Sequence, residues 1–140
     1  MESKVIWKGN MAFTGTSDAG YSIPLDTSKA MGGSDNAIQP LQLFAIGLVG
    51  CTAMDVISIL QKKRQQITDF EVSAQIERAE EHPKVFTKIL LEYKITGKNL
   101  DKKAVDRAVE LSETRYCAAK AMLEKTAEIE TVITMIEADE

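Results

Sequence analysis

The sequence has few of the residues that build metal sites and disulfide frameworks. Its 140 residues include one histidine and two cysteines, and the cysteines, Cys51 and Cys117, are not in a Cys-x-x-Cys spacing. A zinc site would have to draw on carboxylates, and two cysteines are too few for a disulfide framework. We expect no metal, no cofactor, and a chemical rather than structural role for any pairing of the two thiols.

The chain also lacks a block of basic residues. Its 17 basic and 21 acidic side chains give a net charge of -4 and are interspersed along the sequence. A nucleic-acid surface needs clustered lysine or arginine. No nucleic-acid partner is therefore expected.

Neither a secretory signal nor a long apolar run is evident. The first four residues lead directly into a strand-like segment, without the apolar stretch and cleavage site of a signal peptide. The longest apolar run, residues 43–54, ends at Asp55 and is shorter than the roughly 20 residues of a membrane span. We expect a buried helix there, no membrane association and a cytoplasmic location.

No phosphate loop, dinucleotide-binding glycine pattern or nucleophile elbow occurs. Internal repeats and linker-like segments are also missing. With 44% hydrophobic and 27% charged residues, residues 1–140 are predicted to form a single globular domain.

The first half of the chain predicts a β-meander followed by a helix. Residues 4–7 and 11–14 are β-prone and are joined by Gly9-Asn10, which suits a tight hairpin turn. A third strand is predicted at residues 20–26 and a long loop at 27–39. Pro40 suits the first turn of a helix, which is predicted to run to residue 66.

The second half predicts two strands, two helical stretches and a closing strand. Apolar residues alternate with polar ones around residues 70–76 and 89–95. Asp101 can cap a helix, a second helical stretch follows Cys117, and a strand is predicted at residues 129–136. The order βββ-α-ββ-αα-β indicates an α+β fold.

Cys51 and Cys117 carry the candidate chemistry. A buried free cysteine is usually inert, but two cysteines on separate helices can meet. A thiol peroxidase needs one thiolate to take an oxygen from the peroxide and a second thiol to condense with the resulting sulfenic acid. A helix break near Gly50 would place Cys51 at a helix N-terminus, whereas an unbroken helix would leave the thiolate in need of a cation.

Several segments carry a family resemblance. Residues 39–45 (QPLQLFA), 50–56 (GCTAMDV) and 111–117 (LSETRYC) resemble the two cysteine motifs of the family of osmotically inducible and organic hydroperoxide resistance proteins, known as OsmC/Ohr. Residues 55–62 and 122–125 are most similar to its YhfA-like branch. The resemblance spans essentially the whole chain.

The resemblance implies an OsmC-like fold that forms an intertwined homodimer, with long central helices packed between sheets. It also implies reduction of organic hydroperoxides, with Cys51 as the peroxidatic and Cys117 as the resolving cysteine. The implied partners are a second copy of the chain, an apolar hydroperoxide and a dithiol reductant that recycles the disulfide.

Two residues of the family's active site are not matched. The family glutamate falls at Leu41, and the family arginine comes from the N-terminal region, whereas residues 1–63 contain no arginine. Lys29 and Arg115 are candidate replacement cations.

Two alternatives to the peroxidase remain open. A non-enzymatic dimer could bind an apolar small molecule at the subunit interface, with the cysteines structural or redox-sensing. A purely structural dimer would be favoured if the two sulfurs were too far apart for a disulfide.

Overall fold

The computed structural model describes residues 1–139. The chain divides into two compact units, Met1–Phe44 and Ala45–Glu140. The prediction of one domain over the whole chain stays a prediction, and each unit is described by itself.

The first unit is built on a three-stranded antiparallel sheet. Its strands β1 (Ser3–Gly9), β2 (Ala12–Ser17) and β3 (Ser22–Leu25) pair in the order β1-β2-β3. Gly9 and Asn10 have φ angles of 108° and 47°, as a tight hairpin turn requires. The predicted meander is confirmed.

Asp26 organises the long loop that follows β3. Its side chain is buried, and its carboxylate accepts hydrogen bonds from the backbone N–H groups of Thr27, Ser34 and Asn36 at 2.8, 3.2 and 3.3 Å. A Cβ atom at Gly33 would lie 2.2 Å from the Thr27 carbonyl oxygen, so only glycine fits this close approach. The loop contains one short 3-10 turn, η1 (Lys29–Met31).

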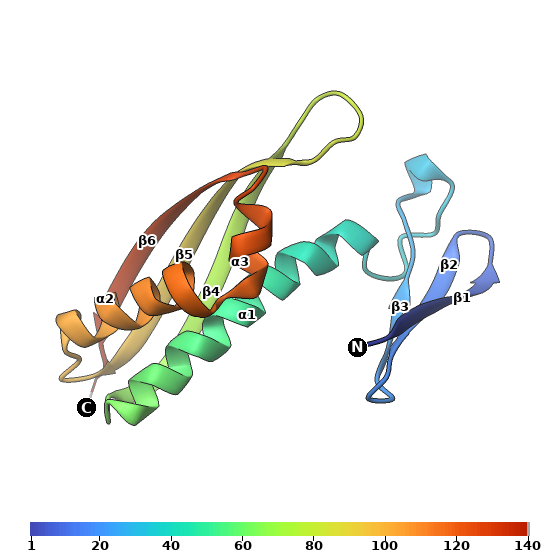
Figure 1. Cartoon of the computed structure of the whole chain (residues 1–140). Coiled ribbons are helices and arrows are strands. Elements are labelled where there is room, and N and C mark those ends of the chain that lie inside the picture. Colours follow the sequence, from blue (N-terminus) through green and yellow to red (C-terminus); the bar gives the residue numbers. More distant parts are fainter. Residues whose placement is uncertain (140) are drawn as a thin grey trace. The chain divides into compact units, whose positions relative to one another are not determined.

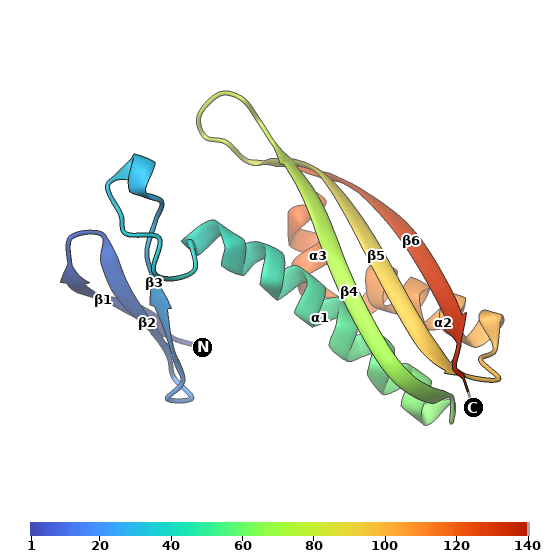
Figure 2. The ribbon, with the colours of Figure 1, turned by 180° about the vertical axis from the view of Figure 1, so that it is seen from behind.

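The second unit packs helices against one face of a second sheet. Strands β4 (Gln66–Arg78), β5 (Phe86–Lys98) and β6 (Glu128–Glu137) pair in the order β4-β5-β6, with β4 and β5 antiparallel and β5 and β6 parallel. Parallel neighbours need a long crossover, which α2 (Lys102–Leu111), the turn η2 (Ser112–Tyr116) and α3 (Ala118–Leu123) supply. Seen from both sides, the helices cover one face of this sheet (Figures 1 and 2). The predicted order βββ-α-ββ-αα-β is confirmed.

The core of the second unit lies between β5 and the helices. The inward-facing residues of β5 alternate along the strand, and those of the long helix α1 (Pro40–Lys62) recur at every fourth position. Complete burial of an aliphatic side chain contributes about 1.5–3 kcal/mol. The fully buried side chains on these two elements are Ile89, Leu91, Tyr93, Ile95, Leu48, Thr52, Val56 and Leu60.

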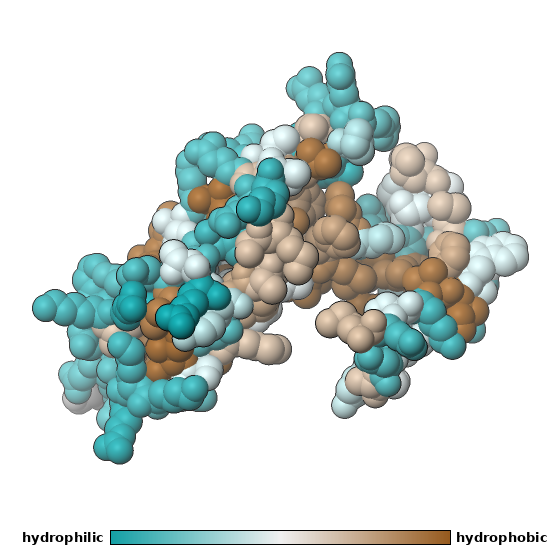
Figure 3. Space-filling model, in the orientation of Figure 1, coloured by the Kyte–Doolittle hydropathy of each residue, from teal (hydrophilic) through white to brown (hydrophobic). Residues whose placement is uncertain are grey.

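Much of α1 is left uncovered within the chain. Phe44, Ile46 and Met54 are exposed by 58%, 52% and 73%, and Figure 3 shows apolar surface along this helix. With 23 residues, α1 is long and apolar enough to cross a membrane by length and composition, so the expectation that the apolar run is too short was wrong. The core helix of a soluble protein can be equally long and apolar. Helix α1 buries one face against the sheet.

Candidate functional site

Cys51 lies in the middle of an unbroken helix. Helix α1 runs from Pro40 to Lys62 without interruption, which places Cys51 about three turns from its N-terminus. The field of the helix N-terminus fades within the first turn. The alternative of a helix break at Gly50 is therefore wrong, and Cys51 is half-buried on a regular helix.

Cys117 owes its position to a single π-helical turn. In η2 the Cys117 N–H donates to the Ser112 carbonyl oxygen at 2.7 Å, five residues back, so one extra residue is accommodated after α2. Cys117 then takes extended backbone angles, and its sulfur accepts the Lys120 N–H at 3.4 Å at the start of α3. The predicted break between two helical stretches is confirmed, and Cys117 is only 3% exposed.

The fold brings the two predicted cysteines together. Cys51 and Cys117 are free thiols, and their sulfur atoms and a carboxylate oxygen of Asp55 all lie within 4.8 Å of one another. The role of Asp55 was missed in the sequence, although Asp55 follows Cys51 by four positions and ends an apolar run. Residues with that spacing share one face of a helix.

A chain of hydroxyl groups connects this cluster to the sheet. Ser112 Oγ donates to Asp55 Oδ2 at 2.9 Å, and Thr52 Oγ1 lies 2.7 Å from both Ser112 Oγ and Tyr93 Oη. An ionised carboxylate only accepts, and each hydroxyl has one proton. Ser112 must therefore accept from Thr52, and Thr52 from Tyr93, so the Asp55 charge orients the whole chain.

The electrostatic setting keeps a proton on Cys117. Burial raises the pKa of its thiol to about 11, the Lys120 N–H opposes this rise, and Cys51 and Asp55 add to it. Burial also raises the pKa of Tyr93, and the hydrogen bond that Tyr93 shares with Thr52 opposes this rise. Because Cys117 keeps its proton, its S–H group can act as the hydrogen-bond donor to the neighbouring Cys51.

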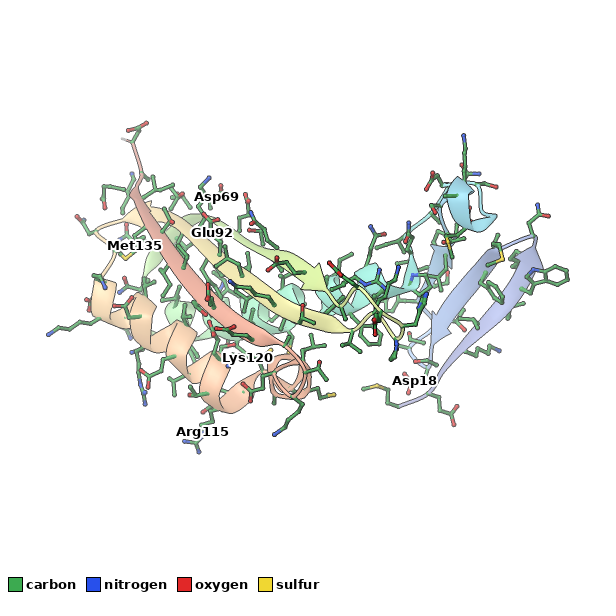
Figure 4. All side chains as sticks on the ribbon, turned by 90° about the horizontal axis from the view of Figure 1, so that it is seen from above. Asp18, Asp69, Glu92, Arg115, Lys120 and Met135 are labelled. Atoms are coloured by element: carbon green, nitrogen blue, oxygen red, sulfur yellow. The ribbon has the colours of Figure 1, made fainter. Side chains whose placement is uncertain are left out.

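Of the two cations named from the sequence, Arg115 does not face this cluster and Lys29 belongs to the other unit. The Arg115 guanidinium lies over the ring of Tyr116, 5.7 Å from its centroid, and Arg115 projects outward from the chain (Figure 4). Lys29 is an exposed residue of η1 in the other unit. Lys120, which the sequence did not single out, pairs through Nζ with Glu124 at 3.0 Å.

Three further residues of the site were not found from the sequence. Thr52, Tyr93 and Ser112 are fully buried polar side chains that come from α1, β5 and the start of η2. The alternation of apolar and polar residues placed Tyr93 on the buried face of its strand but gave no sign of its role in the site. No sequence signal pairs Thr52 with Ser112, since they meet only through packing of α1 against the crossover.

Comparison with known proteins identifies relatives across nearly the whole chain. A family model described as OsmC-like protein matches residues 33–132. The chain is 41% identical over 129 residues to Protein YhfA of Escherichia coli strain K12, covering 92% of this chain and 93% of that protein.

Solved structures agree in fold. An OsmC-like protein from Mycoplasma pneumoniae superposes with a TM-score of 0.81 at 17% identity, covering 96% of each chain. A protein from Legionella pneumophila described as an organic hydroperoxide resistance protein OsmC superposes with a TM-score of 0.71 at 18% identity, covering 95% of each chain. The predicted OsmC-like α+β fold is confirmed.

Proposed function

The chain belongs to the OsmC-like protein family, and we propose that it is a thiol-dependent peroxidase that reduces organic hydroperoxides in defence against oxidative stress. One observation carries the proposal. Two thiols from separate helices lie together, with both sulfurs within 4.8 Å of each other. Peroxide reduction followed by disulfide formation needs such a pair.

The proposed cycle has three steps. The Cys51 thiolate attacks the outer oxygen of the hydroperoxide, the O–O bond breaks, and the alkoxide leaves as an alcohol after taking a proton. Cys51 is now a sulfenic acid. The Cys117 sulfur attacks it, an S–S bond forms and water leaves, and an external dithiol then reduces the disulfide back to two thiols.

Burial and hydrogen bonding support this division of roles. Cys51 is half-buried on α1, whereas Cys117 is buried and its raised pKa keeps it protonated at neutral pH. The S–H group of Cys117 can donate to a Cys51 thiolate and so stabilise it. This donor offsets part of what the unmatched family glutamate and arginine would supply.

A homodimer in the cytoplasm is the proposed working form. The exposed apolar residues of α1, with Ile46 at 52% and Met54 at 73%, are suited to contact with a second copy of the chain. A Cβ atom at Gly47 or Gly50 would meet nothing within 4 Å, so another helix could approach closely there. Such an interface would also favour an apolar hydroperoxide as substrate.

A binding protein without peroxidase activity is the second candidate. The first unit has an open, largely apolar hollow of about 580 Å³, lined by residues that include Val5, Tyr21, Ile23 and Leu43. A volume in this range fits a small organic molecule. This candidate predicts saturable binding without consumption of peroxide.

The deciding experiment is consumption of cumene hydroperoxide in excess dithiothreitol, with hydrogen peroxide as comparison. We expect turnover by the wild type and loss of at least about 100-fold in Cys51→Ser, because the attacking thiolate is gone. Without dithiothreitol, Cys117→Ser should still reduce one equivalent and accumulate a Cys51 sulfenic acid that dimedone traps. Mass spectrometry should find the Cys51–Cys117 disulfide in oxidised wild type alone. Equal rates in wild type and Cys51→Ser would reject the peroxidase and favour the binding protein.

A further inference from the structure

We infer that Cys51, Cys117 and Asp55 form a binding site for a thiophilic divalent cation, with Zn²⁺ as the ion that fits best, in the reduced protein. The inference goes beyond the proposed peroxidase and does not rest on it. It requires only two reduced thiols and a carboxylate in the arrangement described above.

The spacing of the donor atoms suits Zn²⁺. Tetrahedral zinc has Zn–S and Zn–O bonds of about 2.3 Å and about 2.0–2.2 Å, which sets the distances between its ligand atoms at roughly 3.5–3.8 Å. The two sulfurs and the carboxylate oxygen already lie within 4.8 Å of one another. Each side of this triangle must shorten by about 1.3 Å at most, which needs only small rotations of the three side chains.

The ligands come from two elements in a pattern that metal sites use. Cys51 and Asp55 are four residues apart on α1, a helical spacing that directs two side chains at the same ion. Cys117 supplies the third ligand from the end of η2. Three protein ligands leave the fourth position to water.

Charge also favours a cation here. Two thiolates and a carboxylate would carry three negative charges, and the nearest basic side chains of η2 and α3 are engaged elsewhere. Lys120 pairs with Glu124 at 3.0 Å, and Arg115 lies over Tyr116 and points outward (Figure 4). A divalent cation would neutralise most of this charge, and the two thiol protons would pass to solvent on binding.

The carboxylate is already held for this purpose. Asp55 Oδ2 accepts from Ser112 Oγ at 2.9 Å, and Ser112 is fixed in turn by Thr52. Carboxylates that bind metals are commonly oriented by such outer hydrogen bonds, whose loss weakens binding by about 10–100-fold. The buried hydroxyl chain therefore orients Asp55 toward the two sulfurs.

Zn²⁺ and a disulfide would exclude each other, because both use the same two sulfur atoms. Binding involves no electron transfer, so the metal would protect the reduced thiols and block attack on a peroxide. Formation of the S–S bond would release the ion. The site would then couple metal availability to the redox state of the pair.

The test is a titration of the reduced, metal-free protein with Zn²⁺ by calorimetry and with Co²⁺ by absorption spectroscopy. We expect one ion per chain and the intense near-ultraviolet band of a thiolate-to-cobalt bond. Cys51→Ser, Cys117→Ser and Asp55→Asn should each weaken Zn²⁺ binding at least about tenfold. Asp69→Asn is the matched control, an exposed aspartate on β4 (Figure 4).

Circular dichroism would establish that each variant is folded, and the disulfide form of the wild type provides a test without mutation. The disulfide form should not bind, and reduction with a phosphine should restore binding. A wild type without the thiolate band, or an Asp55→Asn variant that binds as tightly as Asp69→Asn, would overturn the site. Because no peroxide is used, this outcome is independent of whether the peroxidase assay succeeds.

Discussion

At the scale of single residues, a chain of hydroxyl groups joins the candidate site to the buried core. Thr52 is the centre of the buried chain, since its Oγ1 lies 2.7 Å from both Tyr93 and Ser112. All three side chains are fully buried. Each hydroxyl therefore needs its partner, because water is not available to replace it.

Thr52→Val keeps the shape of the side chain and removes its hydroxyl. We expect a loss of about 1–3 kcal/mol in the free energy of unfolding, because the buried Tyr93 hydroxyl loses its acceptor and Ser112 keeps only its bond to Asp55. Urea unfolding followed by circular dichroism measures this loss. Thr68→Val, at an exposed position on β4, should change the same quantity by no more than about 0.5 kcal/mol. Similar values for the two variants would contradict the role given to the chain.

At the scale of elements, local sequence patterns predicted nearly every helix and strand. Alternation in residues 89–95 identified the inward face of β5, and Pro40 marked the start of α1. The end of α1 at Lys62 was predicted four residues late, because the reversal there uses Arg64 at a φ of 57° rather than glycine. The π turn at Ser112–Tyr116 had no signal, since its register depends on packing between α2 and the sheet.

The candidate site could be predicted from the sequence only in part. Cys51 and Cys117 could be named from the sequence because cysteines are few and chemically distinctive. Asp55 could have been identified because it follows Cys51 by four residues on the same helix. The contact between Thr52 and Ser112 was not, because it joins elements 60 residues apart that meet only after the sheet has formed.

The loop between β3 and α1 should respond to acid through Asp26. Its three backbone hydrogen bonds lower the pKa of the carboxyl below its ordinary value. The charged Asp26 carboxylate therefore stabilises the folded protein, and this contribution is fully present at a pH above the unfolded-state pKa of about 3.9. It is lost as the pH falls through the lower pKa of the folded state. We expect wild type to exceed Asp26→Asn in melting temperature at pH 6 and the difference to shrink below about pH 4.

Melting curves of the two proteins from pH 3 to pH 7 measure this effect. Asp35→Asn, an exposed aspartate in the same loop, serves as the control and should follow the wild type throughout. A pH-independent gap between wild type and Asp26→Asn would show that the charge of Asp26 does not stabilise the loop.

At the scale of the whole molecule, the described chain covers a long apolar helix only in part. Only one face of α1 is buried, and Met54 on another face is 73% exposed. This exposure is unusual for a helix as long and as apolar as α1. The proposed homodimer would cover it with a second copy of the chain.

Met54→Lys should therefore shift the protein from dimer to monomer, because it places a charge in the proposed interface. Analytical ultracentrifugation at several protein concentrations measures the change, with an expected weakening of at least about tenfold in the dissociation constant. Val132→Lys is the control, an exposed apolar residue of β6 that pairs with Glu92 and so faces away from the helices. Dimers unaffected by Met54→Lys would remove α1 from the interface.

The hydroxyl groups of Tyr93, Thr52 and Ser112 form one hydrogen-bonded chain, so their three protons must all point in the same direction along it. A negative charge at Asp55 draws all three toward it. Glu113 lies close enough to Tyr93 to raise its pKa. In Asp55→Asn the side-chain amide can donate to Ser112, which would let the three hydroxyls reverse together. The direction of the hydroxyl chain thus depends on the group that stands beside the two cysteines, and the O–H vibration of Tyr93 would report that direction from the far end of the chain.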